Sequence, residues 1–286
     1  MLGINAVLLA TKVREGNCCF FGDQPFSGHG SIGQRLNLTF GRCNTLATII
    51  RNANSPNWGI ASAAPAYIGG GAAGLVLENF GDGPFFAGAV PAETVAAMAV
   101  IAAAVVPAAR GLPVGINVLR NDGAAALAIA AASGASFVRV NVLSGAMVTD
   151  QGLIQGRAAE LMRLKRLLNI NDVGIFADVL VKHAYPLAAQ PMAEAVEDTL
   201  QRAGADAVII SGVATGSAPS MADLEAARAA AHGAPVLIGS GCNNQNAADM
   251  APLVDGVIVA SSLKCDGQLF NPVDLQRVRQ LRQLLN

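Results

Sequence analysis

From about residue 71 onward, short apolar runs alternate with polar loops and with longer stretches rich in alanine. Each run is rich in aliphatic residues, precedes a loop of Gly, Asn, Asp or Ser, and is followed by a segment long enough for a helix. This alternation is typical of βα units that build a parallel sheet. The pattern therefore predicts seven strands, within Ala73 to Phe80, Pro113 to Leu119, Phe137 to Leu143, Val173 to Val181, Ala207 to Ser211, Pro235 to Gly239 and Gly256 to Ala260.

Residues that begin and end helices fall between these runs. Asp122 is placed to cap the helix after the second run, and Asn271 before Pro272 is placed to cap the last helix. Gly134 follows a helical stretch, at the position where a left-handed residue closes the last turn. The predicted helices therefore lie where a βα plan needs them.

An eighth strand must come from the first seventy residues, where Leu2 to Leu9 is the clear apolar run. Eight units favour a closed (β/α)8 TIM-type barrel, which commonly forms a single domain of this length. A doubly wound open sheet uses the same alternation and is the alternative. We therefore expect one barrel domain over residues 1–286, with an atypical segment 1–70 supplying the first βα unit and residues 71–286 the regular remainder.

Composition limits the classes of partner. The formal net charge is -1 and the isoelectric point is near 6.3, so the chain lacks the excess basic charge of a nucleic-acid-binding protein. The apolar stretch from Glu93 to Arg110 is shorter than the ~20 residues of a membrane span and contains Pro107, so no integral membrane segment is expected. Five cysteines without paired spacing and no evident secretory signal predict a cytoplasmic protein.

Polar residues gather where the predicted strands end. In a TIM-type barrel the active site lies at the carboxyl ends of the strands, so these residues are the candidates for ligand binding and catalysis. Two of them, Arg139 and Asn141, alternate with valines and therefore share one face of their strand. The candidates for substrate binding are Asn79, Asn117, Arg120, Asn121, Arg139 and Asn141, and the candidates for catalysis are Glu78, Asp178, Lys182 and His183.

These charged residues have two interpretations. An inward-facing arginine, aspartate and lysine need one another or an anionic ligand, so they can form a structural ion-pair network inside the barrel. Alternatively, Asp178 or Glu78 is a general acid or base, while Lys182 or His183 stabilises developing negative charge. A Schiff base on Lys182 is compatible with this second interpretation.

A metal site has weaker support. Three of the strand-end residues, Glu78, Asp122 and Asp178, carry oxygen ligands that suit Mg²⁺. No compact ligand motif accompanies them, so the sequence predicts no cofactor beyond a candidate Mg²⁺.

Small residues follow the last three predicted strands. Barrels of this type commonly bind phosphate with backbone N–H groups from the loops after their last two strands, and glycine lets the backbone approach an anion closely. The alternative is that these residues only form tight βα turns. The candidate phosphate-binding residues are Ser211 and Gly212, then Gly239, Ser240 and Gly241, and finally Ser261 and Ser262.

Several longer motifs resemble the BtpA/SgcQ family. They are Val-Leu-Glu-Asn-Phe-Gly-Asp (76 to 82), Gly-Ile-Asn-Val-Leu-Arg-Asn-Asp (115 to 122), Phe-Val-Arg-Val-Asn-Val-Leu-Ser-Gly-Ala-Met-Val-Thr-Asp-Gln-Gly (137 to 152) and Phe-Ala-Asp-Val-Leu-Val-Lys-His-Ala (176 to 184). The resemblance implies a barrel of the ribulose-phosphate-binding type. One branch of the family is associated with photosystem I biogenesis at a membrane surface, another with sugar utilisation. The first seventy residues depart from the family pattern, which has a His-Leu and Pro-rich loop after its first strand.

Two functions follow from the residues and the resemblance. The first is an enzyme that acts on a small phosphorylated, sugar-like metabolite by acid-base chemistry. The second is a non-catalytic factor for the biogenesis or stability of a membrane protein complex, which would reach the membrane through a protein partner. The oligomeric state stays open, because burial on a barrel explains the alanine-rich helices as well as a homo-oligomer does.

Overall fold

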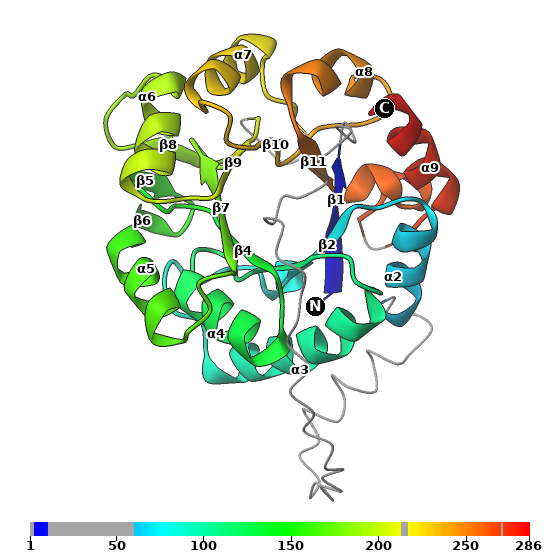
Figure 1. Ribbon diagram of the computed structural model, residues 1–286, viewed down its shortest axis with the longest axis horizontal. Coiled ribbons are helices and arrows are strands. Elements are labelled where there is room, and N and C mark those ends of the chain that lie inside the picture. The colour runs from blue at the N-terminus through cyan, green and yellow to red at the C-terminus, as the bar shows by residue number, and fades with distance from the viewer. Residues whose placement is uncertain (1–2, 11–59, 213–216, 270) are drawn as a thin grey trace, which may run out of the picture.

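The computed structural model describes residues 3–10, 60–212, 217–269 and 271–286. Its strands form a closed barrel in the order β1-β11-β10-β9-β7-β4-β3-β2, and the helices surround it (Figure 1). All seven strands predicted from the apolar runs are present. The barrel strands are β1 (Gly3–Ala10), β2 (Gly74–Glu78), β3 (Val114–Asn117), β4 (Phe137–Val140), β7 (Gly174–Val179), β9 (Ala207–Ile210), β10 (Val236–Ile238) and β11 (Gly256–Val259).

The direction of β1 differs from the expectation. The other neighbouring barrel strands run parallel, whereas β1 is antiparallel to both β2 and β11. The apolar run at Leu2 to Leu9 is therefore a barrel strand, but the prediction that it opens a parallel βα unit is wrong. Strand pairing in either direction satisfies main-chain hydrogen bonds, so an antiparallel strand also closes the barrel. Because Gly3 pairs with Glu78, β1 starts at the end where the parallel strands finish.

The helices of the described residues lie mostly where the sequence placed them. Asp122 caps α4, since its Oδ1 accepts a hydrogen bond from Ala125 N at 2.9 Å. The predicted cap of the last helix is wrong: Asp274, not Asn271, accepts the first N–H groups of α9, because the preceding chain is extended and Val273 pairs with Lys264. The helices are α2 (Ile60–Gly69), α3 (Ala92–Ala108), α4 (Gly123–Ser133), α5 (Ala158–Leu167), α6 (Met192–Glu197), α7 (Met221–Ala230), α8 (Ala247–Met250) and α9 (Leu275–Leu284).

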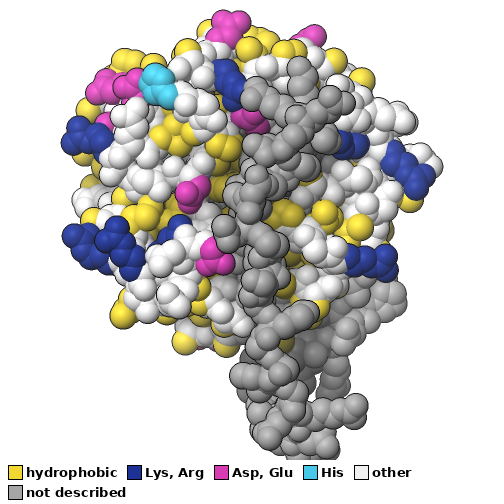
Figure 2. Space-filling view, viewed as in Figure 1, with side chains coloured by type: hydrophobic (Ala, Val, Ile, Leu, Met, Phe, Trp, Pro, Cys, Tyr) yellow, Lys and Arg dark blue, Asp and Glu magenta, His cyan; other side chains and the backbone are white. Residues whose placement is uncertain are grey.

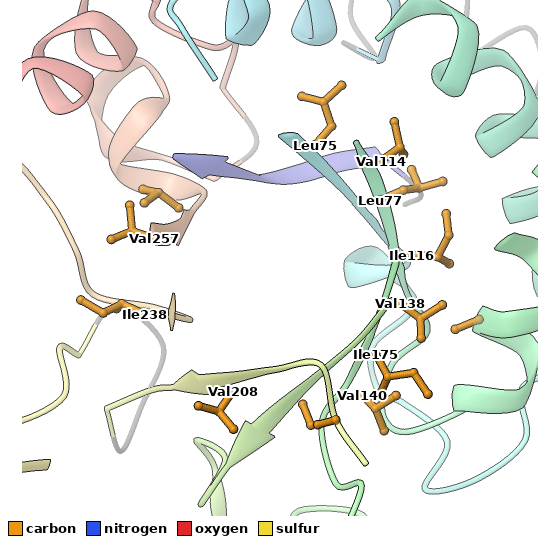
Figure 3. Close-up of a cluster of buried hydrophobic side chains, with 14 of the residues drawn as sticks. Leu75, Leu77, Val114, Ile116, Val138, Val140, Ile175, Val208, Ile238 and Val257 are labelled. Carbon is orange, nitrogen blue, oxygen red and sulfur yellow. The ribbon is translucent and has the colours of Figure 1, made fainter. Parts of the chain in front are cut away.

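Apolar strand residues divide into two sets, as a period of two requires. One set, which includes Leu75, Ile116 and Val138, points away from the barrel centre and packs under the helices (Figure 3). The other set fills the barrel interior, where the rings of Phe137 and Phe176 stack with centroids 4.5 Å apart. The barrel is therefore a packed core at this level, and it is not an open channel.

A small antiparallel sheet stands beside the barrel and was not predicted. It has the order β6-β5-β8, with β5 at Ala146–Thr149, β6 at Gly152–Gln155 and β8 at Ala184–Pro186. One of its faces packs Met147 and Ile154 onto Val142 and Val181. The sheet is built from the loops that follow β4 and β7, so it flanks the end of the barrel where those strands finish.

Two features of the described residues concern the expected partners: the apolarity of the helices and the distribution of basic side chains. In the residues that the structure covers, no helix is long and apolar enough to cross a membrane. On the face shown in Figure 2, Lys and Arg side chains are spread around the edge and form no single patch. Cys242 and Cys265 are free thiols, and Cys18, Cys19 and Cys43 lie outside the described residues.

Candidate active site

The inward-facing positions of the barrel change from apolar to polar as the strands approach their carboxyl ends. Phe137 and Phe176 lie in the apolar interior, and two residues later their strands present Arg139 and Asp178. In the same way, Val76 precedes Glu78 on β2. The apolar layer therefore forms the floor of a polar layer.

Arg139 and Asp178 form a buried, bidentate ion pair at the centre of this layer. Arg139 Nε and Nη2 each donate to a carboxylate oxygen of Asp178 at 2.8 Å. The side chain of Asp178 is 0% exposed and that of Arg139 is 4% exposed. Burial alone would lower the pKa of Arg139, but the charge and hydrogen bonds of Asp178 outweigh it and raise that pKa. Arg139 is therefore held in its charged form beside Asp178.

Two buried amides and Glu78 extend this network. Asn117 Nδ2 donates to Glu78 Oε1 at 3.1 Å, and Asn141 Nδ2 donates to Asp178 Oδ2 at 3.1 Å. Arg139 Nη1 also lies 3.5 Å from Glu78 Oε1. These bonds turn each amide oxygen away from its carboxylate, and among the described residues neither Oδ1 atom has a hydrogen-bond partner.

Arg120 and Lys182 add two further cations, from the ends of β3 and β7. Arg120 Nη2 donates to the backbone oxygen of Lys182 at 2.8 Å, and its Nε lies 4.0 Å from Asp150. Burial lowers the pKa of Lys182, and the charge of Arg139 lowers it further. His183 is exposed, and partial burial followed by the charge of Lys182 lowers its pKa. Cationic groups are thus concentrated on this side of the barrel mouth.

A cavity of about 880 Å³ opens over the polar layer. It brings together most of the predicted site residues, which come from six different strand ends. Those among its lining are Glu78, Asn117, Arg120, Arg139, Asn141, Lys182, His183, Gly239, Ser240, Gly241, Ser261 and Ser262.

The remaining predicted residues hold the walls of the site. Asn79 exchanges hydrogen bonds with the backbone of Leu119, and Asn121 exchanges them with the backbone of Val142. These two amides tie neighbouring βα loops together and are not among the residues that line the cavity. Asp178 lies beneath the cavity, bonded to Arg139.

Ser211 and Gly212 also stand outside the cavity lining. Ser211 Oγ lies 3.4 Å from Asp178 Oδ1, so it belongs to the ion-pair network. A Cβ on Gly212 would lie 2.4 Å from Ser217 O, so this glycine allows a close approach between backbone segments. Both residues therefore stabilise the structure around the cavity and do not line it.

The loops after β10 and β11 line the cavity with small residues. The N–H groups of Gly241, Ser261 and Ser262 have no acceptor among the described residues. Gly241 has a positive φ of 80°, and a Cβ on Gly239 would lie 3.1 Å from Arg139 Nη2. In barrel order β10 and β11 are the seventh and eighth strands along the chain, whose loops form the phosphate site in many such barrels.

The structure gives no support to a compact metal centre. Among the described residues, no group of three His, Cys, Asp or Glu side chains is close enough to hold an ion. Asp122 instead accepts backbone N–H bonds from Val90 and Ala125 at 2.8 and 2.9 Å.

Some lining residues were missed in the sequence. Asp150 lies at the tip of the β5–β6 hairpin, and Arg277 reaches the cavity from α9. The segment Thr149-Asp150-Gln151-Gly152 between two alternating runs is a hairpin signal that would have located Asp150. Arg277 carries no comparable signal, because its position depends on how α9 lies against the barrel.

Comparison with known proteins identifies the family. The model of the BtpA family matches residues 46–286. The chain belongs to the BtpA family. Among its relatives, the photosystem I biogenesis protein BtpA of Synechocystis sp. is 51% identical over 218 residues, which are 75% of this chain and 74% of that protein. A protein of Pyrococcus furiosus is 43% identical over 78% of this chain and 83% of its own length.

Solved structures support the fold of this BtpA family member. Phosphoribosyl anthranilate isomerase of Thermus thermophilus matches with a TM-score of 0.51 and 14% sequence identity, over 79% of this chain and 94% of that chain. At this identity the match shows a shared TIM-like architecture, and it assigns no reaction.

Proposed function

We propose that this BtpA family protein binds a small phosphorylated, sugar-like metabolite at the barrel mouth and acts on it by acid-base chemistry. The observation that supports this most is the set of N–H groups at Gly241, Ser261 and Ser262 that have no acceptor among the described residues, on two neighbouring loops that line one cavity. Backbone N–H groups of this kind bind phosphate oxygens well. Gly239 and Ser240 complete the small-residue edge of the cavity.

Glu78 is the better candidate for the acid-base group of the two carboxylates. Asp178 is fully buried, and both of its carboxylate oxygens already accept hydrogen bonds from Arg139 or Asn141. Glu78 lines the cavity itself, with Asn117 bonded to one of its oxygens. Its carboxylate is therefore placed to exchange a proton with a bound ligand.

Lys182 is the better candidate for stabilising negative charge in the reaction. It lines the cavity from the end of β7, whereas the neighbouring His183 is exposed and has a lowered pKa, which keeps it neutral near pH 7. Arg139 reinforces the positive field from below.

Thermal unfolding with a panel of phosphate esters tests this proposal. A ligand present at about a hundred times its dissociation constant stabilises the folded state by about 2.7 kcal/mol, which is a measurable rise in Tm. We expect sugar phosphates to raise Tm, and the same sugars without phosphate to leave it unchanged. Ser262→Pro should remove the effect, because it deletes one of the unbonded N–H groups. Pro252→Ala is the control, because Pro252 lies in the 3₁₀ helix Ala251–Leu253 and this change alters a proline outside the two loops that line the cavity.

An absence of any Tm shift in a folded protein, with and without Mg²⁺, would refute the proposed ligand class. Glu78→Gln should leave the ligand-induced shift in place and abolish turnover of whichever ester binds. A Glu78→Gln variant that retains turnover would refute the role of that carboxylate.

A second candidate function is supported by an exposed apolar face on the β6-β5-β8 sheet. Val148 pairs with Leu153 on one side and with Tyr185 on the other, so the three side chains form a row across the sheet. They are 45%, 50% and 79% exposed, and Leu187 beside them is 65% exposed. An apolar patch of this kind marks an interaction site for another protein. The name of the Synechocystis relative, a photosystem I biogenesis protein, motivates a partner in membrane protein assembly.

Replacement of that relative in Synechocystis by this chain would separate the two functions. If partner binding is the function, the wild type and Glu78→Gln restore photosystem I to the same level, and Tyr185→Ser with Leu187→Ser does not. If catalysis is the function, the pattern is reversed, with Glu78→Gln inactive and the surface variant active.

A further inference from the structure

Two cations of the cavity lie across the barrel from the loop after β11, which carries Ser261 and Ser262. In the closed barrel, β4 is four strands from β11 in either direction, and β3 and β7 flank β4. Arg120 follows β3 and Lys182 follows β7, while Ser261 follows β11. The cavity lining includes all three residues. A ligand that fills the cavity therefore meets the unbonded N–H groups at one end and Arg120 with Lys182 at the other.

These two cations are not neutralised as Arg139 is. Arg139 has the bidentate bond to Asp178 and Glu78 at 3.5 Å. Within the described part of the chain, the guanidinium of Arg120 has one hydrogen bond, to a backbone oxygen, and its ion-pair partner is Asp150 at 4.0 Å, with a side chain that is 59% exposed. Among the described residues, the ammonium group of Lys182 has no hydrogen-bond or ion-pair partner. Arg120 is nevertheless 6% exposed and Lys182 is half-buried.

Cations withdrawn from water without a partner are unfavourable, and they are retained where an anion binds. Burial, the largest cause, lowers the pKa of both Arg120 and Lys182, and the charge of Arg139 adds to the effect on each. The carboxylates of Glu78 and Asp178 oppose it at Lys182 without cancelling it. The field around the two groups therefore favours an incoming negative charge.

We propose that the ligand carries two anionic groups, a phosphate at the loops after β10 and β11 and a second carboxylate or phosphate bound by Arg120 and Lys182. This inference rests on the proposed function and specifies its substrate class. The planar guanidinium of Arg120 suits the two oxygens of a carboxylate or phosphate, and Lys182 adds a compact charge beside it. Sugar phosphates with a single anionic end bind, but more weakly.

Binding constants for matched pairs of probes test the second anionic group. Glycerol 3-phosphate and 3-phosphoglycerate differ at the end away from the phosphate, where the second has a carboxylate. Fructose 6-phosphate and fructose 1,6-bisphosphate form a longer pair that differs by a second phosphate. Titration calorimetry at one fixed ionic strength should show the doubly anionic member of at least one pair binding about tenfold to a hundredfold more tightly. The pair that shows the larger ratio distinguishes a carboxylate from a phosphate.

Variants assign the preference to the two cations. Lys182→Met should reduce the ratio within the pair to less than about threefold, and Lys182→Arg should keep most of it. Arg166→Met is the control, because Arg166 is an exposed cation at the last turn of α5. It lowers the net charge equally and should leave the ratio unchanged.

The outcomes separate this inference from the function on which it rests. Equal binding within both pairs would refute the second anionic group and leave phosphate binding intact. A preference that survives Lys182→Met and Arg120→Met would refute the assignment to these residues. Failure of all four esters to bind would overturn the proposed function and this inference together.

Discussion

Removing the carboxylate of Asp178 should destabilise the fold through the charge that it leaves on Arg139. Loss of one partner from a buried ion pair costs about 3–5 kcal/mol, mainly because the other charge stays buried without compensation. Arg139 would keep Glu78 at 3.5 Å, so we expect Asp178→Ala to lie near the lower end, at about 3 kcal/mol. The change also deprives Asn141 and Ser211 of an acceptor.

The expected shift in Tm follows from the size of the chain. An unfolding entropy of about 2.1 cal/mol/K per residue, over 286 residues, gives about 0.6 kcal/mol/K. A loss of about 3 kcal/mol then lowers Tm by about 5 °C. Calorimetry of the wild type and of Asp178→Ala measures the shift, and Asp172→Ala, at an exposed aspartate, is the matched control that should change Tm by less than about 1 °C.

A double variant separates the buried charge from the loss of packing. Arg139→Met with Asp178→Leu removes both charges and keeps the interior filled, so it should be more stable than Asp178→Ala alone. The reasoning would be refuted if Asp178→Ala were as stable as the Asp172→Ala control. It would also be refuted if the double variant lost more free energy of unfolding than Arg139→Met and Asp178→Leu lose when their separate losses are added.

Three further changes have defined outcomes. Gly115→Ala places a Cβ 2.2 Å from the ring of Phe137. Urea unfolding should therefore show a loss of about 1–3 kcal/mol in the free energy of unfolding, which Phe137→Leu partly restores. An unchanged free energy of unfolding would contradict this close packing. Asp122→Ala removes the carboxylate that accepts the N–H groups of Ala125 and Val90, and should lower the free energy of unfolding by about 1–2 kcal/mol in the same assay. The pKa of Lys182 is lowered in the free protein, and a bound anion should raise it again. Binding of a doubly anionic ligand should therefore weaken as pH rises and should take up protons, which calorimetry in two buffers of different ionisation enthalpy would detect. Binding without proton uptake at any pH up to 10 would count against this role of Lys182.

Much of the barrel and of the site was predictable because both depend on local patterns. Each parallel strand is a mostly apolar run of three to six residues with polar or small residues at its end, and the period of two places Arg139 and Asp178 on the inward face. The parallel arrangement then brings the ends of these strands to one mouth. For this reason Glu78, Asn117 and Lys182 were assigned to one site from the sequence.

The remainder depends on pairings between distant segments. The apolar run of β1 fits a barrel strand in either direction, so its antiparallel orientation could not be read from the run. Asn79 and Asn121 share the composition of binding residues, and only the position of the neighbouring loop shows that each bonds to a backbone segment. Whether Asp178 meets a ligand or Arg139 is likewise decided by the register of β4 against β7.

The antiparallel β1 has a practical consequence for measurements on the site. Gly3 pairs with Glu78 at the mouth, so a tag or fusion partner joined ahead of Gly3 begins beside the carboxylate proposed for acid-base chemistry. The other terminus follows α9, on the outside of the barrel (Figure 1). A carboxyl-terminal tag is therefore the better choice for binding experiments, and a bulky amino-terminal fusion is a simple way to obstruct the mouth without altering any residue of the cavity.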